Sequence, residues 1–467
     1  MRSVALHQLP LPKETPVVWR AEVLPNDVTQ SLPNEEYTVN MTIILSDPMF
    51  NGDFTYTLKF NKEVVSAPIQ GTAQNGRILH NFVKVTGSSS ANALWELGKG
   101  KLHEVRVGDV TESAIVIERF GLRSWGVDEP TGRLTLNGKI VTLHGWNHHT
   151  QWPSIDDGIS VTASMTESQM DFDLAQMQQA GTNYIRGSHY PQDARWLDRL
   201  DELGIAMWSE TLGPGVSLAN IKDPTFMKYQ LQQLDEMLDD AINHAAIMTW
   251  GWFNEGPSDK EEACSGYKEN SERARQRDPS RFVTWADDKE LDSKCLEYAT
   301  LIAFNNYPAW YNTPGDLTAP AKHWNNMANT VRAMYHQKPF VISETGAGGI
   351  FEWSNNSTAG RWTDMYQSEV IGADVDVALH NGNISGITLW HYYDFKGNDG
   401  AEKKCGPCEY APHISPPTCT FVNVTCKRPG GANHKGVVDF WRRKKDSWYV
   451  VQKQYTKAAS SGAVAPP

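Results

Sequence analysis

The chain has 467 residues, 40% of them hydrophobic and 10% aromatic, so it can bury a full core without a metal or disulfide to stabilise it. Lys and Arg number 43 against 55 Asp and Glu, and the resulting net charge of −12 disfavours binding to nucleic acid. The same composition argues against disorder, and no run of about 18 apolar residues is present to predict a membrane-spanning helix.

The N-terminal quarter of the chain predicts a β-sandwich. Residues 1–16 are expected to be a remnant or linker. Residues 17–118 predict an immunoglobulin-like sandwich, because short stretches alternate apolar and polar residues between turn signals. The clearest strands and turns are Tyr37–Leu45, Phe54–Phe60, His103–Val107, Asn51-Gly52 and Asn75-Gly76.

From about residue 135, continuous apolar runs alternate with helical stretches, a pattern typical of a parallel sheet. The eight runs are Ile140–Asn147, Asn183–Tyr190, Gly204–Glu210, Met248–Glu255, Phe282–Asp288, Leu301–Tyr307, Phe340–Gly346 and Gly386–Phe395. Eight repeats predict a TIM (β/α)8 barrel over residues 119–457 rather than an open sheet, which makes the fold class α/β.

Helix signals support the barrel. Thr166–Gln169 is a capping box that opens one helix, and Gly181 is placed to end it. Val331–His336 and Met365–His380 are further helix candidates. A Cys-rich segment at 396–432 is expected to interrupt the barrel as a long loop, and residues 458–467 to form a disordered tail.

Four of the six cysteines cluster in this loop, at Cys405, Cys408, Cys419 and Cys426. They could form a zinc site, a redox Cys-Gly-Pro-Cys pair or two disulfides. Only the first pair has zinc-ribbon spacing, and the redox motif normally begins a helix rather than lying in a Pro-rich loop. We therefore expect disulfides and an oxidising compartment.

Five Asn-x-Ser/Thr sequons agree with a glycoprotein of the extracellular space, the lysosome or another secretory compartment. They begin at Asn40, Asn355, Asn356, Asn383 and Asn423. The first twenty residues lack the basic start and apolar run of a signal peptide, which would then indicate a clipped or mis-started N-terminus. The alternative is that the sequons occur by chance in a cytosolic protein.

Polar or aromatic residues stand at the ends of seven of the eight runs, where a TIM barrel has its active site. These ends are Ser188-His189-Tyr190, Glu210, Asn254-Glu255-Gly256, Asp287-Asp288, Asn305-Asn306-Tyr307, Glu344-Thr345-Gly346 and the stretch from Trp390 to Asp394. Two carboxylates at one barrel end are what glycoside hydrolysis requires: one protonates the leaving oxygen, and the other attacks or stabilises the oxocarbenium-like carbon. The run ends alone do not select the pair.

Motifs in a fixed order resemble the family 2 glycoside hydrolases, the group of β-galactosidases, β-glucuronidases and β-mannosidases. The resemblance covers about residues 115–455 and, more loosely, 17–115. The matching stretches are Phe120–Arg123, Leu136–Lys139, His144–His148, Asp173–Gly181, Asn183–Pro191, Asn243-His244, Trp250–Gly256, Lys338–Gly346, Gly386–Trp390 and Asn433–Gly436.

The resemblance implies a retaining exo-β-glycosidase that works by double displacement on a β-glycoside, without a cofactor or metal. It implies Glu255 as the general acid/base and Glu344 as the nucleophile, with the carboxyl groups about 5–5.5 Å apart. The implied substrate-binding residues are Asn254, His189, Tyr307, Trp390, Asn433 and Lys435. The alternative for Glu255 and Glu344 is a structural salt bridge.

Some roles have close structural alternatives. His189 could instead be a packing histidine that is hydrogen-bonded under a loop. Glu210 is expected to pair with a cation such as Arg186 rather than to react. Asp287 and Asp288 are expected to cap the following helix.

The segment Asn433–Gly436 resembles the Asn-x-Lys-Gly stretch with which glucuronidases read the C6 carboxylate, and Arg428 is nearby in the sequence. A buried Lys435 facing a uronate would form a charge-assisted pair. We therefore favour a β-glucuronidase over a β-galactosidase, although Asn-His-Lys-Gly also occurs in members that act on galactosides. The alternative for Lys435 is a surface cation or a structural support.

The chain departs from the family at three places. Thr345 stands where glucuronidases usually have Tyr, and Thr150 follows His149 where an acidic residue is common. Residues 1–16 are expected to be only a remnant of the family's N-terminal jelly-roll domain. The last departure keeps open a catalytically impaired glycan-binding fragment, and the cysteine cluster keeps open a redox or metal protein. The expected partner is carbohydrate, not nucleic acid or membrane, and a homo-oligomer is allowed.

Overall fold

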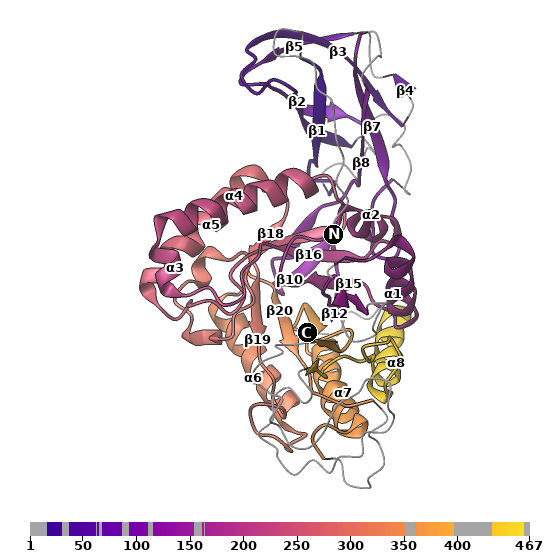
Figure 1. The fold of residues 1–467 in the computed structure, drawn as a ribbon, viewed down its shortest axis with the longest axis vertical. Coiled ribbons are helices and arrows are strands. Elements are labelled where there is room, and N and C mark those ends of the chain that lie inside the picture. Colours follow the sequence, from indigo (N-terminus) through magenta and orange to yellow (C-terminus); the bar gives the residue numbers. More distant parts are fainter. Residues whose placement is uncertain are drawn as a thin grey trace.

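The structure is a computed structural model that describes residues 16–29, 37–61, 63–64, 68–85, 93–110, 115–153, 161–162, 164–351, 360–396 and 432–461. Antiparallel strands of the N-terminal part lie at one end of the molecule, and the barrel with its helices lies at the other (Figure 1). Within the described residues, no helix has the length and apolarity needed to cross a membrane.

The N-terminal strands form two antiparallel sheets around one core. The first sheet has the order β1-β2-β6, and the second β4-β3-β7-β8, with β5 also paired to β3. The strands are β1 (Val18–Pro25), β2 (Thr38–Leu45), β3 (Gly52–Phe60), β4 (Glu63–Val64), β5 (Ile69–Ala73), β6 (Arg77–Lys84), β7 (His103–Asp109) and β8 (Ile115–Phe120). Every second residue of β2 is buried, and these residues pack with the buried residues of β3 in one cluster. The sandwich is therefore present, while its immunoglobulin-like character stays a prediction.

Eight parallel strands form the predicted barrel, in the order β18-β17-β16-β15-β12-β21-β20-β19. They are β12 (Leu143–Asn147), β15 (Tyr184–Gly187), β16 (Ala206–Glu210), β17 (Ile247–Gly251), β18 (Phe282–Thr284), β19 (Ile302–Asn305), β20 (Phe340–Thr345) and β21 (Gly386–Leu389). Backbone hydrogen bonds from Asp287 to Ala303 and from Asn305 to Asp287 close the ring between β18 and β19. Seven of the predicted runs contain one of these strands whole, and β17 begins at Ile247, one residue before the fourth run.

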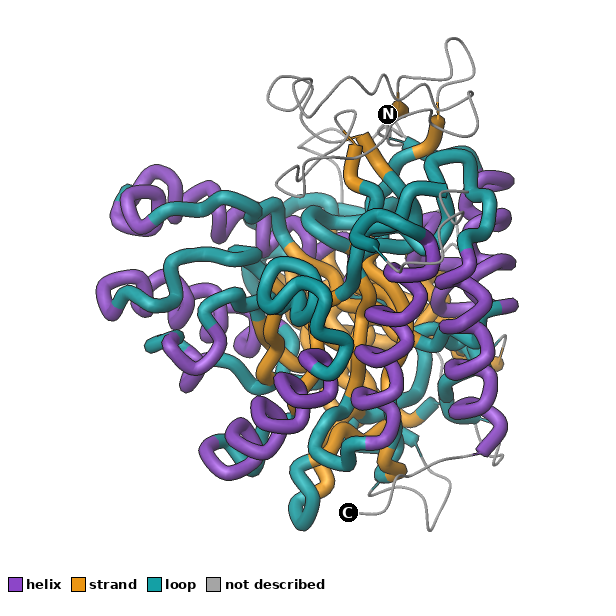
Figure 2. Tube along the Cα trace, turned by 90° about the horizontal axis from the view of Figure 1, so that it is seen from below, coloured by secondary structure: helices purple, strands orange, loops and turns teal. Residues whose placement is uncertain are grey.

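Helices surround the strands, as Figure 2 shows. They are α1 (Glu167–Gln179), α2 (Ala194–Leu203), α3 (Leu218–Lys222), α4 (Pro224–Ala241), α5 (Cys264–Arg277), α6 (Ala319–Met334), α7 (Asp364–His380) and α8 (Asp446–Ser461). The Thr166 capping box is confirmed, since its hydroxyl accepts from the Gln169 amide. Helix α6 begins well before the predicted Val331, because Pro320 is tolerated in its first turn.

The predicted C-terminal tail begins too early, and the predicted disulfides of the cysteine cluster are not tested. Helix α8 continues to Ser461, past the predicted start of the tail at 458. The cysteine cluster and Arg428 lie outside the described residues. A disulfide instead joins Cys264 to Cys295, the two cysteines outside that cluster.

Polar contacts join the sandwich to the barrel. The Val23 amide donates to Asn243 Oδ1 at 2.8 Å, and Asn243 Nδ2 donates back to the Ala21 carbonyl at 2.7 Å. Arg119 on β8 pairs with Asp198 on α2 at 2.7 Å. A small sheet of β9 (Trp125–Asp128), β10 (Arg133–Leu136) and β11 (Lys139–Ile140) follows β8 in the chain.

Candidate active site

Polar residues from several strands meet at the carboxyl end of the barrel, as the sequence predicted. The residues joined there by hydrogen bonds are Asn147, Arg186, His189, Glu210, Asn254, Glu255, Asn305, Tyr307 and Glu344. The carboxyl ends of parallel strands all face one side of a barrel, which brings together residues that are far apart in the sequence.

Arg186 on β15 is the centre of this network and is fully buried. It donates to Glu344 Oε1 at 2.7 Å and to Glu210 Oε1 at 3.0 Å. It also donates to Asn147 Oδ1 at 2.9 Å and to Asn254 Oδ1 at 2.8 Å. Burial lowers the pKa of Arg186, but the charges of Glu210 and Glu344 outweigh burial and hold the pKa above its ordinary value. The predicted pairing of Glu210 with Arg186 is thus confirmed.

Both carboxylate oxygens of Glu344 are held. Oε1 accepts from Arg186, and Oε2 accepts from the Tyr307 hydroxyl at 2.7 Å. Burial, followed by the charges of Glu344 and Glu255, raises the pKa of Tyr307 well above its ordinary value, so its hydroxyl remains a donor. Hydrogen bonds to a charged group are short and directional, and they fix the direction of the Glu344 carboxylate.

Glu255 follows β17 in a left-handed backbone conformation, with φ of 52°. Such a conformation costs a non-glycine residue about 1–3 kcal/mol and is concentrated at functional sites. Oε1 accepts a hydrogen bond from Asn305 Nδ2 at 3.0 Å. Although Glu255 is partly open to solvent, burial of its carboxyl group and the nearby charge of Glu344 raise its pKa to about 7.

Asn254 connects the surroundings of the two glutamates. Its Oδ1 accepts from Arg186 at 2.8 Å, and Asn305 Nδ2 lies 3.4 Å from the same oxygen. Arg186 also holds Glu344, and Asn305 also holds Glu255. Oδ1 is thus occupied, and within the described part of the chain no acceptor bonds the Nδ2 group of Asn254, which remains a donor.

His189 is held from two sides. Its Nδ1 lies 2.9 Å from Glu210 Oε1, and its ring stacks on Trp390 with a centroid distance of 5.1 Å. Burial raises the pKa of Glu210, but Arg186 and His189 outweigh burial and hold it below its ordinary value. The His189 side chain is still 14% exposed, so it is both packed and accessible.

Lys435 is buried, and the alternative of a surface cation is therefore wrong. Its Nζ donates to the Tyr311 hydroxyl at 2.6 Å and lies 4.6 to 5.8 Å from the ring centroids of Tyr307, Trp310 and Tyr311. Cations are attracted to the faces of aromatic rings. Tyr307, one of these rings, also bonds Glu344, so a single tyrosine contacts both the cation and the carboxylate.

Hydrogen bonds to buried side chains hold the segment that carries Lys435. Asn433 Oδ1 accepts from the Lys435 amide at 3.1 Å, and Asp394 Oδ1 accepts from the Gly436 amide at 2.9 Å. Lys445, also buried, donates to the same Asp394 oxygen at 2.8 Å. A Cβ at Gly436 would lie 2.1 Å from the Asp394 nitrogen, so no larger residue fits there without a shift of the backbone.

Asp287 and Asp288 have structural contacts. Asp287 accepts from the Ser258 hydroxyl, the Trp285 indole and the Lys289 amide at 2.8 Å each. Asp288 pairs with Lys289. Asp287 therefore holds the turn before a short 3-10 helix, Glu290–Asp292. The N-cap of that helix is Lys289 and no side chain caps it, so the expectation that Asp287 and Asp288 cap the following helix is wrong.

Several contacting residues had no role assigned from the sequence. Asn147 bonds Arg186, Asn305 bonds Glu255, and Tyr311 bonds Lys435. Asn147 and Asn305 stand at strand ends, which was the available signal. Tyr311 lies beyond β19 in a loop, and no spacing rule predicts its contact.

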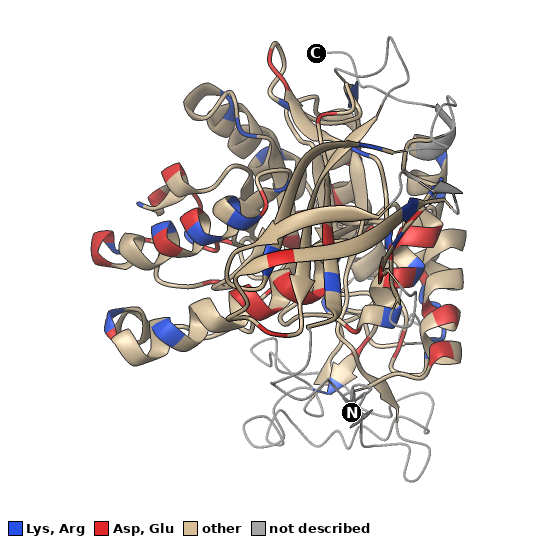
Figure 3. Cartoon of the chain, turned by 90° about the horizontal axis from the view of Figure 1, so that it is seen from above, with Lys and Arg blue, Asp and Glu red and all other residues tan. Residues whose placement is uncertain are grey.

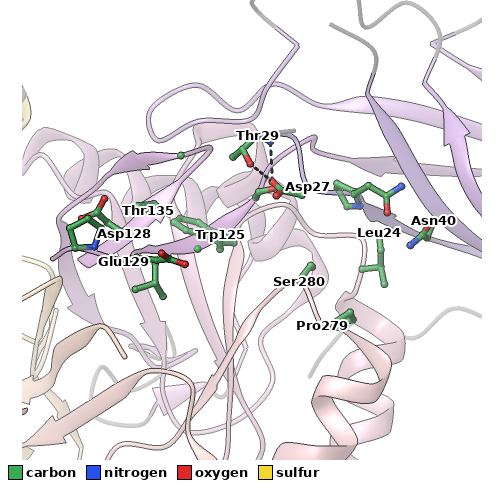
Figure 4. Close-up of a pocket in the computed structure, with 17 residues that line it drawn as sticks. Leu24, Asp27, Thr29, Asn40, Trp125, Asp128, Glu129, Thr135, Pro279 and Ser280 are labelled. Carbon is green, nitrogen blue, oxygen red and sulfur yellow. Dashed lines mark hydrogen bonds between the residues drawn. The ribbon is translucent and has the colours of Figure 1, made fainter. Parts of the chain in front are cut away.

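A cavity of about 750 Å³ lies away from these residues, between the sandwich, the small sheet β9–β11 and the barrel (Figure 4). Its lining includes Asp27, Asn40, Trp125, Asp128 and Ser280. Asp27 accepts from Thr29, and Asp128 accepts from Thr131, so both carboxylates serve local turns. The cavity contains neither predicted catalytic glutamate, and we assign it no chemistry.

Charges elsewhere are mixed in sign. Figure 3 shows Lys and Arg interspersed with Asp and Glu along the outer helices. Asp198, Asp201 and His244 approach one another closely enough to bind a metal, but Arg119 pairs with Asp198, and the Ala246 amide and His244 hold Asp201. Protein groups thus already partner this cluster.

Comparisons with known proteins agree with the geometry. Residues 128–407 match the family model "Glycosyl hydrolases family 2, TIM barrel domain". A β-glucuronidase of Bacteroides fragilis is 28% identical over 73% of this chain and 45% of its own length, and one of Sus scrofa is 24% identical over 73% and 47%. The chain thus spans about half the length of these relatives.

Solved structures share the fold. The β-galacturonidase of Eisenbergiella tayi bound to galacturonate superposes with a TM-score of 0.77 at 22% identity, covering 94% of this chain and 72% of the other. The β-D-glucuronidase of Dictyoglomus thermophilum gives 0.73 at 21% identity, with 94% and 69% covered. With the family model matched over more than half of its residues, the chain belongs to the family 2 glycosyl hydrolases.

Proposed function

We propose that the chain carries the catalytic site of a retaining exo-β-glycosidase that acts on β-glucuronides. The observation that carries the proposal is the contrast between two glutamates at one barrel end. Glu344 is held by a guanidinium and a tyrosine hydroxyl, whereas Glu255 has a pKa of about 7. One is suited to attack as a carboxylate, and the other to give up a proton near neutral pH.

In the first step, an oxygen of Glu344 attacks the anomeric carbon while Glu255 protonates the departing glycosidic oxygen. The bond from the anomeric carbon to the aglycone breaks, and a covalent glycosyl-enzyme forms. In the second step, Glu255 takes a proton from water, and that water displaces Glu344. Both steps invert the anomeric carbon, so the configuration is retained.

The remaining residues fit binding of the sugar. The free Nδ2 donor of Asn254 is suited to the 2-hydroxyl, where hydrogen bonds strengthen in the transition state. His189 and Trp390 supply a ring pair beside Glu210. Lys435 offers a buried cation over the ring of Tyr307, which suits the C6 carboxylate of a uronate.

The sugar is the finer part of the proposal. The β-glucuronidase relatives support glucuronate as the sugar. One structural neighbour is bound to galacturonate, which differs from glucuronate only in its configuration at C4. A β-galactosidase is the second candidate, and a glycan-binding fragment without turnover is the third. A secretory compartment is also proposed, and the Cys264–Cys295 disulfide supports it.

Hydrolysis of nitrophenyl β-glucuronide, β-galacturonide, β-galactoside and β-glucoside by the purified chain tests the proposal, with Glu344→Gln as the blank. Turnover of the glucuronide above the blank is expected. Preference for the galactoside would replace the sugar assignment. Folded protein with no turnover of any substrate would leave the glycan-binding alternative.

A further inference from the structure

Strand β20, which carries Glu344, is irregular at its carboxyl end. On the β19 side, Phe304 pairs with Ile342 but Asn305 pairs with Glu344. On the β21 side, Ile387 pairs with Ile342 but Leu389 pairs with Thr345. Strand β20 therefore contains one more residue than either neighbour at this point, which is a β-bulge, and bulges re-aim the side chains next to them.

The bulge is held on the inner side of the barrel wall. The Ser343 carbonyl accepts from Asn147 Nδ2 at 2.9 Å and from the Thr388 hydroxyl at 2.8 Å. The Ser343 hydroxyl donates to Asn305 Oδ1 at 2.7 Å. These contacts fix the residue before Glu344.

The residue after Glu344 is held from the helix layer. The Thr345 hydroxyl donates to Asp374 Oδ2 at 3.0 Å, and the Trp324 indole donates to Asp374 Oδ1 at 2.9 Å. Thr345 is on β20, Asp374 is on α7 and Trp324 is on α6, and all three are fully buried. Thr345 is also the residue at which the sequence departs from the tyrosine usual in glucuronidases.

Burying the Asp374 carboxyl group between α6, α7 and β20 is energetically unfavourable. Among the described residues, its partners are the neutral Trp324 and Thr345, with no cation, and burial raises its pKa to about 7. An apolar side chain would fill the same space without this cost. What the carboxyl group adds over an apolar side chain is its two hydrogen bonds, from Trp324 and from Thr345. Thr345 is the residue next to Glu344.

We propose that Asp374 is a positioning residue for the nucleophile: through Thr345 it holds the outer side of the β20 bulge and so sets the direction of Glu344. The inference rests on the proposed role of Glu344. A misplacement of the attacking oxygen by about 1 Å can slow a reaction by about 100-fold, so an anchor one residue away has a large effect on rate.

The experiment measures the rate at which Glu344 is labelled by 2-deoxy-2-fluoro-β-glucuronyl fluoride. The Glu344 oxygen bonds to the anomeric carbon, the carbon–fluorine bond breaks and fluoride leaves, and peptide mapping locates the label. This rate reports the attack itself, while thermal unfolding of the same variants reports stability.

Asp374→Leu removes both hydrogen bonds with a larger side chain of the same branching, and Thr345→Val removes the hydroxyl alone. Labelling is expected to slow by about 10- to 100-fold in each, with the change in the maximal rate and not in reagent affinity. Asp374→Asn and Thr345→Ser keep partners for both contacts and should stay within about threefold of the parent. The double variant should be no slower than the slower single variant, because both break one link.

Trp324→Phe is the matched control. It removes the hydrogen bond on the α6 side of Asp374 and leaves the bond to Thr345, so stability should fall while labelling stays within about twofold. Label on Glu344 at the parental rate in Thr345→Val and Asp374→Leu would overturn the inference, and Thr345→Val decides alone if Asp374→Leu does not fold. Slowing in Trp324→Phe as large as in Asp374→Leu would also overturn it. Absence of label from Glu344 in the folded parent would overturn the proposed function together with it.

Discussion

Buried arginines stand at both ends of the barrel, and their partners differ in kind. At the amino end, Arg281 lies just before β18 and pairs with Asp278. It donates to the carbonyl oxygens of Ile242, His244 and Ile247, which lie before or at the start of β17. At the carboxyl end, the hydrogen bonds of Arg186 all reach side chains. These belong to Asn147, Glu210, Asn254 and Glu344.

The difference separates two uses of a buried cation. A guanidinium bonded to carbonyl oxygens fixes the course of the backbone, and its loss is a loss of stability. A guanidinium bonded to side chains also fixes where those side chains point, and its loss removes the alignment of a reactive group. Variants at the two ends of the barrel should therefore differ in whether they lose activity or stability.

The largest effect is expected at the carboxyl end. Glu344→Gln should lower kcat on the preferred glycoside by more than about 1,000-fold, because an amide cannot form the glycosyl-enzyme. The unfolding midpoint should change little. Steady-state kinetics and thermal unfolding check both statements, with the exposed Glu297→Gln as the control; turnover near the parental rate would remove Glu344 as the nucleophile.

At the amino end, Arg281→Met should lower the free energy of unfolding by about 3–5 kcal/mol, since it leaves the buried Asp278 without its cation. The kcat of the folded fraction should stay within about threefold of the parent. Denaturant unfolding and kinetics at low temperature measure the two quantities. The surface variant Arg275→Met controls for loss of charge; a large fall in kcat with intact stability would contradict the distinction drawn here.

A selective effect is expected at Lys435. Lys435→Met should cost about 2–5 kcal/mol in kcat/KM on the glucuronide, because a uronate carboxylate would be left buried without its cation. The same variant should act on neutral glycosides almost as the parent does. Substrate competition measures the ratio directly; an equal loss on both classes would make Lys435 a structural support.

The smallest effect appears with pH. Because Glu255 must be protonated to act as an acid and its pKa is raised to about 7, kcat/KM should fall about tenfold per pH unit above 7. Glu255→Ala should lack this alkaline limb on a substrate with a good leaving group and should be accelerated by azide. An unchanged pH profile in Glu255→Ala would assign the limb to another residue.

Much of the fold could be predicted, because apolar runs and their polar ends are local signals. Seven barrel strands fall within predicted runs and β17 begins one residue before its run, and Glu255 and Glu344 stand at the end of the barrel where such a fold has its site. The start of α6 was placed too late because its first turns mix polar residues with Pro320. The end of α8 lies in a stretch of small residues that resembles a tail.

Other parts of the site depend on contacts between distant segments. The hydrogen bond from Thr345 to Asp374 joins a strand to a helix, and no sequence pattern around either residue predicts it. The bulge in β20 depends on register with both neighbours, which sequence periodicity does not contain. The burial of Lys435 likewise follows from three aromatic rings brought together by the loops.

The pairing of β12 with β21 has a consequence for how the protein is made. Asn147 and Thr388, which both bond the Ser343 carbonyl, are 241 residues apart in the chain. A ribosome must therefore deliver nearly the whole barrel before its first strand meets its last, and contacts of such long range form slowly. Until then β12 has an unpaired edge, so nascent barrel chains depend on late closure both for an active site and for protection from aggregation.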